Sequence, residues 1–200
     1  MKMSGNGLVI VISAPSGAGK STLCSKLAQK LPNLYCSVSC TTRPKRPGEK
    51  DGRDYFFVSE KKFKEMIRRK ELVEWACVHD HYYGIPRQFL EKNIRAGKDT
   101  VLNIDVQGAL KIRRLFPGSV LIFVMTPTMA ELEKRLRARK QDSDAVIRTR
   151  LRNARRELRF LPKYDYLVIN DKLADALCEL EAIVIAEHRR LAHLSPPRFK

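Results

Sequence analysis

The sequence predicts an α/β fold in which a parallel β-sheet carries helices on both faces. Four apolar, β-branched runs alternate with helical stretches along the 200 residues. The first run leads directly into a glycine-rich loop and a helix with regularly spaced leucines. Two segments break the alternation, near residues 36–91 and 131–160, and predict additions to the sheet and its helices.

The first strand is expected at residues 8–12, an unbroken apolar run typical of a parallel strand buried on both faces. The following helix has leucines four residues apart and is expected to end at Pro32. Similar runs predict core strands at residues 100–104, 120–124 and Tyr166–Ile169.

The first interruption, residues 36–91, is interpreted as an inserted substrate domain. It contains a turn-rich loop, a short strand, a helix beginning at Ser59, a strand near residues 72–76 and an expected turn at residues 82–84. The second interruption is interpreted as an amphipathic helical cover. Its apolar face comprises Ile147, Leu151, Ala154, Leu158 and Leu161, and a neighbouring face comprises Arg148, Arg152, Arg155 and Arg159.

Composition indicates one globular unit, since 44% of the residues are hydrophobic. The apolar runs are far shorter than the roughly 18 residues of a membrane helix, and the N-terminus does not resemble a secretory signal. A cytoplasmic protein is therefore expected. Five cysteines without a C-x-x-C pair indicate neither a disulfide framework nor a zinc site.

The net charge of +17 predicts attraction to polyanions. Residues 131–159 hold eleven basic side chains against five acidic ones, and residues 43–46 form a second basic cluster. Two clusters that converge on a pocket would suit a phosphate substrate, whereas a continuous stripe with exposed aromatics would suit RNA. Charge alone leaves both possibilities open.

The segment SAPSGAGKST, residues 13–22, follows the first strand and matches the phosphate-loop pattern G-x-x-x-x-G-K-[ST] except at its first glycine, which is Ala14. Alanine is expected to be tolerated there if its φ is negative, whereas Gly17 and Gly19 allow close approach of phosphate. Lys20 is expected to bridge the β- and γ-phosphates of ATP, and Ser21 to help hold Mg²⁺. The expected ATP contacts are Ala14, Pro15, Ser16, Gly17, Ala18, Gly19, Lys20, Ser21 and Thr22.

Further segments match a known family in order and spacing. They are SVSCTTRPKRPGE at 37–49, GRDY at 52–55, EWA at 74–76, YYG at 82–84 and IDVQG at 104–108. With the phosphate loop, they make the chain resemble guanylate kinase over essentially residues 6–190. The resemblance implies Mg²⁺-dependent transfer of the ATP γ-phosphate to GMP, and to dGMP, giving ADP and GDP in purine nucleotide metabolism.

The resemblance also implies a three-layer, parallel-sheet core like that of phosphate-loop NTPases, an inserted nucleoside-monophosphate-binding domain and a helical lid. The expected limits are 36–91 for the GMP-binding domain and 131–160 for the lid. The core would then comprise residues 1–35, 92–130 and 161–200.

The family's acceptor-site roles carry over to particular positions. Arg43 and Arg46 would grip the GMP phosphate, and their planar, permanently charged forks suit that task. Tyr55 and Tyr83 would donate to the same phosphate, and Glu74 and Ser39 would recognise guanine. Asp105 would lie near GMP and the metal, although the same residue is also a plausible helix N-cap.

On the ATP side, the resemblance assigns Arg139 and Arg150 of the lid to the phosphates and Asn170 to the region of the adenine. Lys20, Arg43, Arg139 and Arg150 are the expected catalytic residues. Because the GMP phosphate is mostly a dianion at neutral pH, these cations would offset charge repulsion, and no general base is expected.

Besides Ala14, the chain departs from the family at Ile85, Asn103 and Lys140. Ile85 replaces a Thr or Ser that hydrogen-bonds guanine O6, Asn103 a second carboxylate and Lys140 a glycine. The alternatives are a kinase for another small phosphate acceptor, a non-catalytic guanylate-kinase-like scaffold and a nucleic-acid-binding protein. The favoured interpretation needs no membrane or nucleic-acid partner and allows a monomer or a homodimer.

Overall fold

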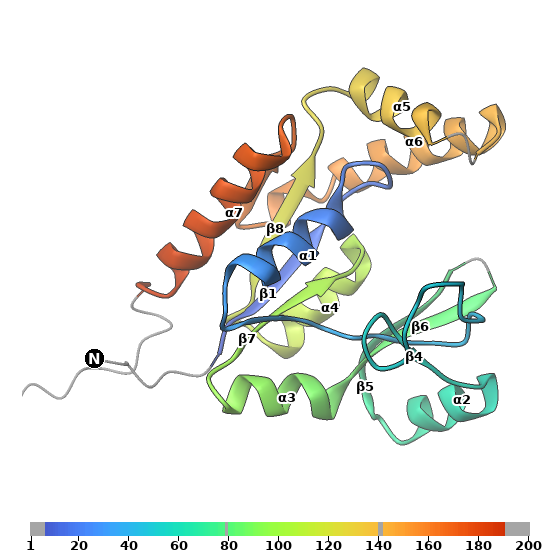
Figure 1. Ribbon diagram of the computed structural model, residues 1–200, viewed down its shortest axis with the longest axis vertical. Coiled ribbons are helices and arrows are strands. Elements are labelled where there is room, and N and C mark those ends of the chain that lie inside the picture. The colour runs from blue at the N-terminus through green and yellow to red at the C-terminus, as the bar shows by residue number, and fades with distance from the viewer. Residues whose placement is uncertain (1–6, 79, 140–141, 191–200) are drawn as a thin grey trace, which may run out of the picture.

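The computed structural model describes residues 7–78, 80–139 and 142–190 (Figure 1). These residues form nine strands and seven α-helices. The strands are β1 Val9–Ser13, β2 Leu34–Cys36, β3 Cys40–Thr41, β4 Phe56–Phe57, β5 Leu72–Val78, β6 His81–Pro86, β7 Asp99–Asn103, β8 Val120–Met125 and β9 Tyr166–Ile169. The α-helices are α1 Lys20–Lys30, α2 Glu60–Arg68, α3 Arg87–Arg95, α4 Val106–Leu115, α5 Met129–Ala138, α6 Asp144–Leu158 and α7 Leu173–Glu187.

The core is a five-stranded sheet in the order β2-β7-β1-β8-β9. All its strand pairs are parallel, and β1 lies at the centre between β7 and β8. The predicted α/β class with a parallel sheet is therefore confirmed. Because the strands are parallel, their carboxyl ends meet at one edge of the sheet, where ligands bind in folds of this kind.

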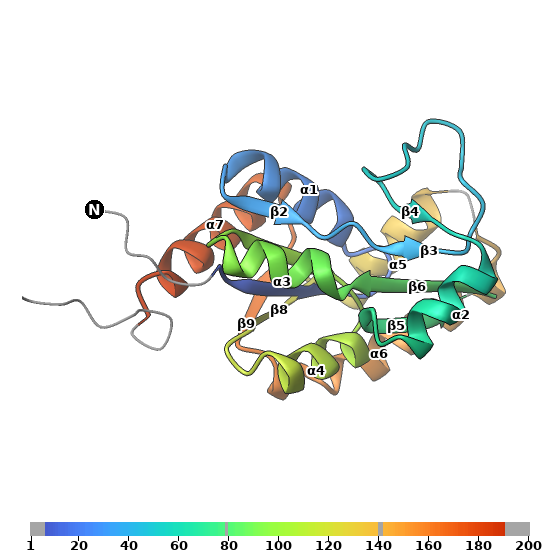
Figure 2. The ribbon, with the colours of Figure 1, turned by 90° about the horizontal axis from the view of Figure 1, so that it is seen from below.

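Helices cover both faces of this sheet, which gives the three expected layers. One apolar cluster joins α1 and α7 to a first set of alternating strand residues, including Ile10 and Ile122. A second cluster joins α3 and α4 to the opposite set, including Val11 and Leu121. Figure 2 shows α1 and α7 on one side of the sheet and α4 on the other. The alternation of side chains along each buried strand thus fills two separate cores.

A second sheet of four strands, in the order β4-β3-β6-β5, lies within the segment predicted as an insertion. The turn expected at residues 82–84 is wrong, because these residues belong to β6, which pairs with β3 and β5. Gly84 serves close packing: a Cβ added there would lie 2.8 Å from the Leu72 side chain. The chain reverses nearer Asp80, whose φ is 64°.

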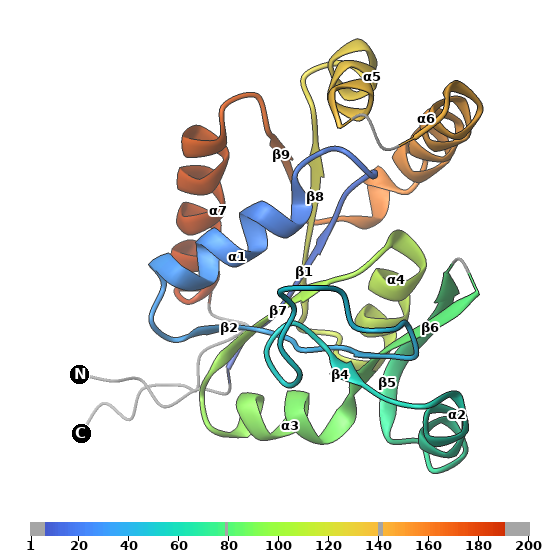
Figure 3. The same cartoon turned by 45° about the vertical axis from the view of Figure 1, so that its right-hand side comes forward.

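The segment predicted as a helical cover forms α5 and α6. Thr128 caps α5, its side chain accepting a hydrogen bond from the backbone N–H of Glu131. Ile147 and Ala154 are buried on α6, whereas Leu161 lies in a short 3₁₀ helix, Leu161–Lys163, after α6 has ended. Figure 3 shows α5 and α6 on one side of the phosphate-loop end of β1, with the four-stranded sheet on the other. The exact domain limits remain a prediction.

None of the helices in the described ranges is both long enough and apolar enough to cross a membrane.

Candidate functional site

The phosphate loop connects the buried end of β1 to the first residue of α1. Gly17 and Gly19 have φ values of 99° and 91°, which favour glycine. A Cβ at Gly19 would lie only 2.4 Å from the side-chain nitrogen of Asn170. Ala14 is buried and its φ is not positive, which is the condition under which alanine is expected to replace the usual glycine. The N-terminus of α1 therefore opens onto a loop that can bring backbone N–H groups to an anion.

Asn170 fastens this loop to the turn that follows β9. Its side-chain nitrogen donates to the Ala18 carbonyl at 2.7 Å, and its side chain is buried. Arg135 of α5 donates to the carbonyl oxygens of Asn170 and Asp171, at 2.9 and 3.1 Å. These contacts join the phosphate loop, the turn and α5 into one continuous framework on the side expected to receive adenine.

Lys20 reaches from the loop to the end of β7. Its Nζ donates to the Ile104 carbonyl at 2.9 Å. Burial lowers the pKa of the Lys20 ammonium, while nearby Cys24, Asp105 and Glu157 act in the opposite direction. An ammonium held at the end of β7, in the electrostatic neighbourhood of Asp105 and Glu157, is suitably placed to meet an incoming phosphate.

Ser21, Asn103 and Asp105 lie at the same edge of the sheet. Asn103 donates from its side-chain nitrogen to the Ser21 hydroxyl at 3.1 Å. Asp105 caps α4, with Oδ1 accepting from the Gly108 N–H at 2.8 Å. Asp105 therefore forms the helix cap that was weighed against its role as a ligand, and its other carboxylate oxygen is left for that role.

A magnesium site at Ser21 and Asp105 fits these donors. Mg²⁺ commonly takes only one or two protein oxygens and completes its octahedron with waters and substrate phosphates. No group of three or more His, Cys, Asp or Glu side chains that could hold a metal occurs in the described residues. The donor set therefore suits a metal that arrives with a nucleotide and does not indicate a metal cage built by the protein alone.

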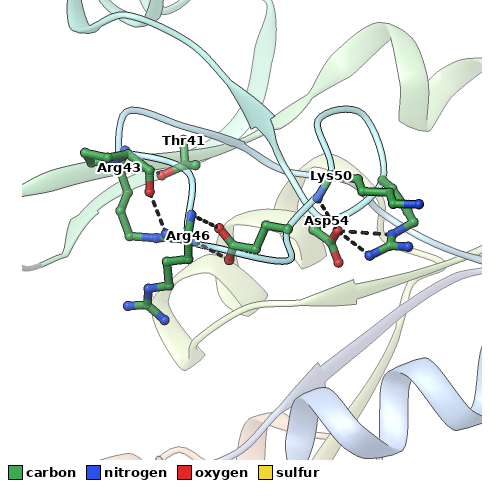
Figure 4. Close-up of polar contacts among 8 residues, drawn as sticks. Thr41, Arg43, Arg46, Lys50 and Asp54 are labelled. Atoms are coloured by element: carbon green, nitrogen blue, oxygen red, sulfur yellow. Dashed lines mark hydrogen bonds and ion pairs between the residues drawn. The ribbon is translucent and has the colours of Figure 1, made fainter.

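Arg43, Tyr55 and Tyr83 come together in the inserted sheet. The Arg43 guanidinium carbon lies 5.5 Å from the Tyr55 ring centroid, and the Tyr55 and Tyr83 ring centroids are 5.9 Å apart. Arg46 is exposed, and its guanidinium points away from the loop in Figure 4. The Arg43 guanidinium and the two phenol rings thus lie together, while the Arg46 guanidinium is exposed to solvent.

Glu74 is the buried carboxylate on this side of the site, with 7% of its surface exposed. It pairs with Lys111 of α4 at 3.4 Å. Burial raises the pKa of Glu74, Lys111 lowers it, and Asp105 adds a further increase. A Cβ on Gly108 would lie 3.2 Å from the Glu74 carboxyl carbon, so this glycine makes room for the acid.

Ser39 and Ile85 flank the same region. Ser39 immediately precedes β3 and is partly buried. Ile85 sits opposite Glu74 in the pairing of β5 with β6, and its side chain is 1% exposed in the apolar cluster with Val73 and Leu90. The departure at position 85 is therefore accommodated by packing, and it supplies no polar group to a base.

The lid contributes one of its two expected arginines to the site. Arg150 donates to the Ser16 hydroxyl at 2.6 Å and pairs with Asp142 at 3.0 Å. Arg139, the residue after α5, is exposed, and none of its hydrogen bonds or ion pairs within the described ranges reaches the phosphate loop. Lys140 lies outside the described residues.

A cavity of about 390 Å³ lies along α6, with Ser16 of the phosphate loop in its wall. Its walls include Ser16, Arg150, Asn153 and Glu157. Burial raises the pKa of Glu157 to about 7, against the opposing effect of Lys20. The cavity wall therefore combines the Arg150 guanidinium with a carboxyl whose pKa is raised to about 7 and which interacts with the lysine of the phosphate loop.

Three residues of this site were not assigned roles from the sequence. They are Lys111 beside Glu74, Arg135 beside Asn170 and Glu157 near Lys20. The i,i+4 spacing of Glu131 and Arg135 was a local signal for an ordered arginine. The other contacts join residues far apart in the chain, and local sequence patterns contain no signal for them.

Comparison with known proteins adds independent findings. The guanylate kinase family profile matches residues 6–187. A guanylate kinase of Caldanaerobacter subterraneus subsp. tengcongensis is 48% identical over 191 residues, covering 96% of this chain and 93% of the relative. One of Thermotoga maritima is 45% identical, covering 92% and 89% of the two chains.

The crystal structure of guanylate kinase from Anaplasma phagocytophilum superimposes with a TM-score of 0.78 at 34% identity. It covers 96% of this chain and 92% of that one. Profile, sequence and structure thus agree over nearly the whole length, with the phosphate loop and the inserted sheet included. The chain belongs to the guanylate kinase family.

Proposed function

We propose that the protein is an ATP:GMP phosphotransferase whose acceptor site is the inserted sheet and whose donor site is the phosphate loop. Family membership supports the reaction, in which ATP and GMP yield ADP and GDP. The observation that carries the assignment of the acceptor side is Glu74, a buried carboxylate held against the first turn of α4. That helix begins beside Asp105, in the electrostatic neighbourhood of Lys20.

Glu74 can distinguish guanine from adenine by its hydrogen-bonding capacity. An ionised carboxylate has only acceptors, and guanine offers two neighbouring donors, N1–H and the 2-amino group. Adenine presents an acceptor at N1, so it cannot make the same pair of bonds. Ser39 contributes a second polar group from the chain segment before β3. The side chain of Ile85 offers no hydrogen bond to O6, which predicts weaker GMP binding without a change of base.

The GMP phosphate is held between Arg43, Arg46, Tyr55 and Tyr83. Arginine forks match phosphate oxygens in geometry and stay charged at any physiological pH. The acceptor is already nucleophilic as a dianion, so these side chains hold it in line with the γ-phosphate of ATP and offset the repulsion between the two.

The donor phosphates lie on the loop from Ala14 to Thr22, with Lys20 at the β- and γ-phosphates. Arg150 exchanges its Ser16 contact for phosphate oxygens, and Arg139 joins it when α5 and α6 move over the nucleotide. These cations offset the charge that spreads over the transferring group. Asn170, tied to Ala18, positions the adenine side of the site.

Ser21 and Asp105 are the residues proposed to hold Mg²⁺ with the nucleotide. The ion, when bound, supplies positive charge to the β- and γ-phosphate oxygens. Asn103 replaces a carboxylate and donates a hydrogen bond to Ser21, so the protein contributes a single acid to this site. We therefore expect Mg²⁺ binding to depend less on protein carboxylates and more on the phosphates of the bound nucleotide.

A cytoplasmic setting is supported by the cysteines of the described chain. Cys24, Cys36, Cys40, Cys77 and Cys178 are all unpaired, which suits a reducing compartment. We place the enzyme there as a monomer or homodimer acting on ATP with GMP or dGMP.

One assay tests the substrate assignment. ADP release is measured with magnesium-ATP and each of GMP, dGMP, AMP, CMP and UMP. GMP is expected to give the highest kcat/KM, with dGMP next, because the contacts of Glu74 and Arg43 involve base and phosphate and do not involve the 2′-hydroxyl. Preference for AMP, or turnover with none of these acceptors, would contradict the proposal.

A further inference from the structure

Glu49 occupies the centre of the loop that carries the two phosphate-gripping arginines. Its Oε1 accepts from Arg43 Nη2 at 2.6 Å, and its Oε2 accepts from the backbone N–H of Arg46 at 2.8 Å. This one carboxylate therefore bridges the two positions. The ion pair is partly shielded from solvent, with 11% and 20% of the Arg43 and Glu49 side chains exposed.

The remaining contacts of Arg43 restrict its orientation further. Nη1 donates to the Pro44 carbonyl at 2.7 Å. The guanidinium carbon lies 5.5 and 5.8 Å from the ring centroids of Tyr55 and Phe57. Two hydrogen-bond acceptors and two rings therefore fix a side chain that is ordinarily flexible. Of its five N–H donors, Arg43 uses two in these bonds, which leaves donors for a phosphate.

We propose that Glu49 is a positioning residue for the acceptor phosphate: it holds Arg43 and the Arg46 backbone in the geometry that receives GMP. This inference rests on the proposed function. Glu49 does not contact the reacting atoms, and it acts through Arg43. Because the carboxylate bonds a side chain and a main-chain group at once, it closes residues 43–49 into a ring that is ordered before the substrate arrives.

The same loop supplies a matched control. Asp54 accepts from the backbone N–H of Lys50 at 2.7 Å and from Nε and Nη2 of Arg53 at 3.0 and 2.9 Å. It therefore also bridges an arginine fork and a main-chain N–H (Figure 4). The difference is the arginine, since Arg53 is exposed and has no assigned role in the site.

The experiment compares Glu49→Gln, Glu49→Asp and Asp54→Asn with the unmodified enzyme, by steady-state kinetics in GMP and in magnesium-ATP. Glu49→Gln is expected to raise the KM for GMP about tenfold, the effect of weakening a charge-assisted hydrogen bond that orients the phosphate ligand. Its kcat and its KM for ATP should stay within about twofold of the unmodified enzyme. Glu49→Asp, which keeps the charge, should recover part of the loss, and Asp54→Asn should leave the KM for GMP unchanged.

Thermal melts and calorimetric titration with GMP accompany the kinetics. Equal melting temperatures with weaker GMP binding in Glu49→Gln would support positioning. An unchanged or lower KM for GMP in Glu49→Gln would overturn the inference, as would an equal loss in Asp54→Asn or a parallel rise in the KM for ATP. If the unmodified enzyme turned over GMP normally in these cases, only the role of Glu49 would fail. An unmodified enzyme inactive on GMP would overturn the proposed function as well.

Discussion

Lys20 is the single residue on which transfer should depend most. Its ammonium donates to the Ile104 carbonyl at 2.9 Å. Lys20 also directly precedes Ser21, the proposed metal ligand. Lys20→Met keeps a long side chain and removes the charge that offsets repulsion at the γ-phosphate. We expect kcat to fall about 10³-fold or more, by analogy with the loss of a transition-state cation. ADP release measures this loss.

Calorimetric titration with GMP gives the control for Lys20→Met, because the acceptor site lies in the inserted sheet and should retain its affinity. Turnover close to that of the unmodified enzyme would contradict the assigned role of Lys20.

Glu157 predicts a pH dependence of stability. Burial raises the pKa of this carboxyl from its ordinary 4.5 to about 7 in the folded protein. The folded state therefore binds more protons than the unfolded state between these values, so this group's contribution to stability falls as pH rises from about 4.5 through 7. Because Glu157 is partly exposed, the loss is of order 1 kcal/mol. Glu157→Gln has no titratable carboxyl at this position, so it should remove this loss of stability at high pH.

Urea unfolding at pH 5 and pH 8 measures this difference. Glu157→Gln should be more stable than the unmodified protein at pH 8 and nearly equal to it at pH 5. Glu179→Gln, an exposed change on α7, serves as the control. An identical pH slope in the unmodified protein and Glu157→Gln would show that Glu157 titrates normally.

At the scale of elements, the phosphate loop requires glycine at position 19 for two reasons: its positive φ and the close approach of the Asn170 side chain. Gly19 has a φ of 91°, and a Cβ there would meet Asn170 at 2.4 Å. Gly19→Ala is therefore expected to destabilise the fold by about 2 kcal/mol or more, by backbone strain and by displacing the Asn170 bond to Ala18. It should also weaken ATP binding. Thermal melts and ATP titration measure both effects.

Gly48→Ala is the matched control, because Gly48 has a φ of 86° and no neighbouring atom within 4 Å of an added Cβ. It should show only the backbone cost, about 1 kcal/mol. Equal destabilisation by the two changes would mean that the contact with Asn170 contributes nothing.

The elements also show what the sequence could predict. Strands β1, β7, β8 and β9 were predicted to within about a residue. The signal was clearest for β1 and β8, whose apolar runs are buried on both faces, whereas β9 at the sheet edge keeps the apolar run with Leu167 and Ile169 exposed. Strand β6 was missed, because Tyr82-Tyr83-Gly84 has the composition of a turn. Gly84 is required because the Leu72 side chain packs closely against it. This contact arises from the pairing of β5 with β6, so the residues next to Gly84 in the sequence do not indicate it.

The site divides in the same way. Lys20, Ser21 and the glycines follow from a contiguous motif, and the family resemblance supplied Arg43, Glu74 and Asp105. The bond from Asn103 to Ser21 joins residues 82 positions apart and exists because β7 lies beside β1 in the sheet. The resemblance placed Asn103 near the metal site, but order along the chain does not specify its neighbour, so its hydrogen bond to Ser21 could not be predicted.

At the scale of the whole molecule, the two sets of cations lie on different bodies. Arg43 belongs to the inserted sheet and Arg139 and Arg150 to the segment of α5 and α6, on opposite sides of the phosphate-loop end of β1 (Figure 3). Arg139 is exposed, and Arg150 is bound to Ser16 and Asp142. Binding of both nucleotides places phosphates between the two sets of cations. We therefore expect GMP and an ATP analogue together to draw the bodies inward.

Small-angle X-ray scattering measures this closure. The radius of gyration, ~16 Å for a compact chain of this length, should fall by about 5% with both ligands and by less with either alone. Arg139→Gln should reduce the compaction and kcat together, because it removes a cation that reaches ATP only after closure. Identical scattering with and without ligands would show that α5 and α6 already stand in their working position, and Arg139 would then have no route to the phosphates.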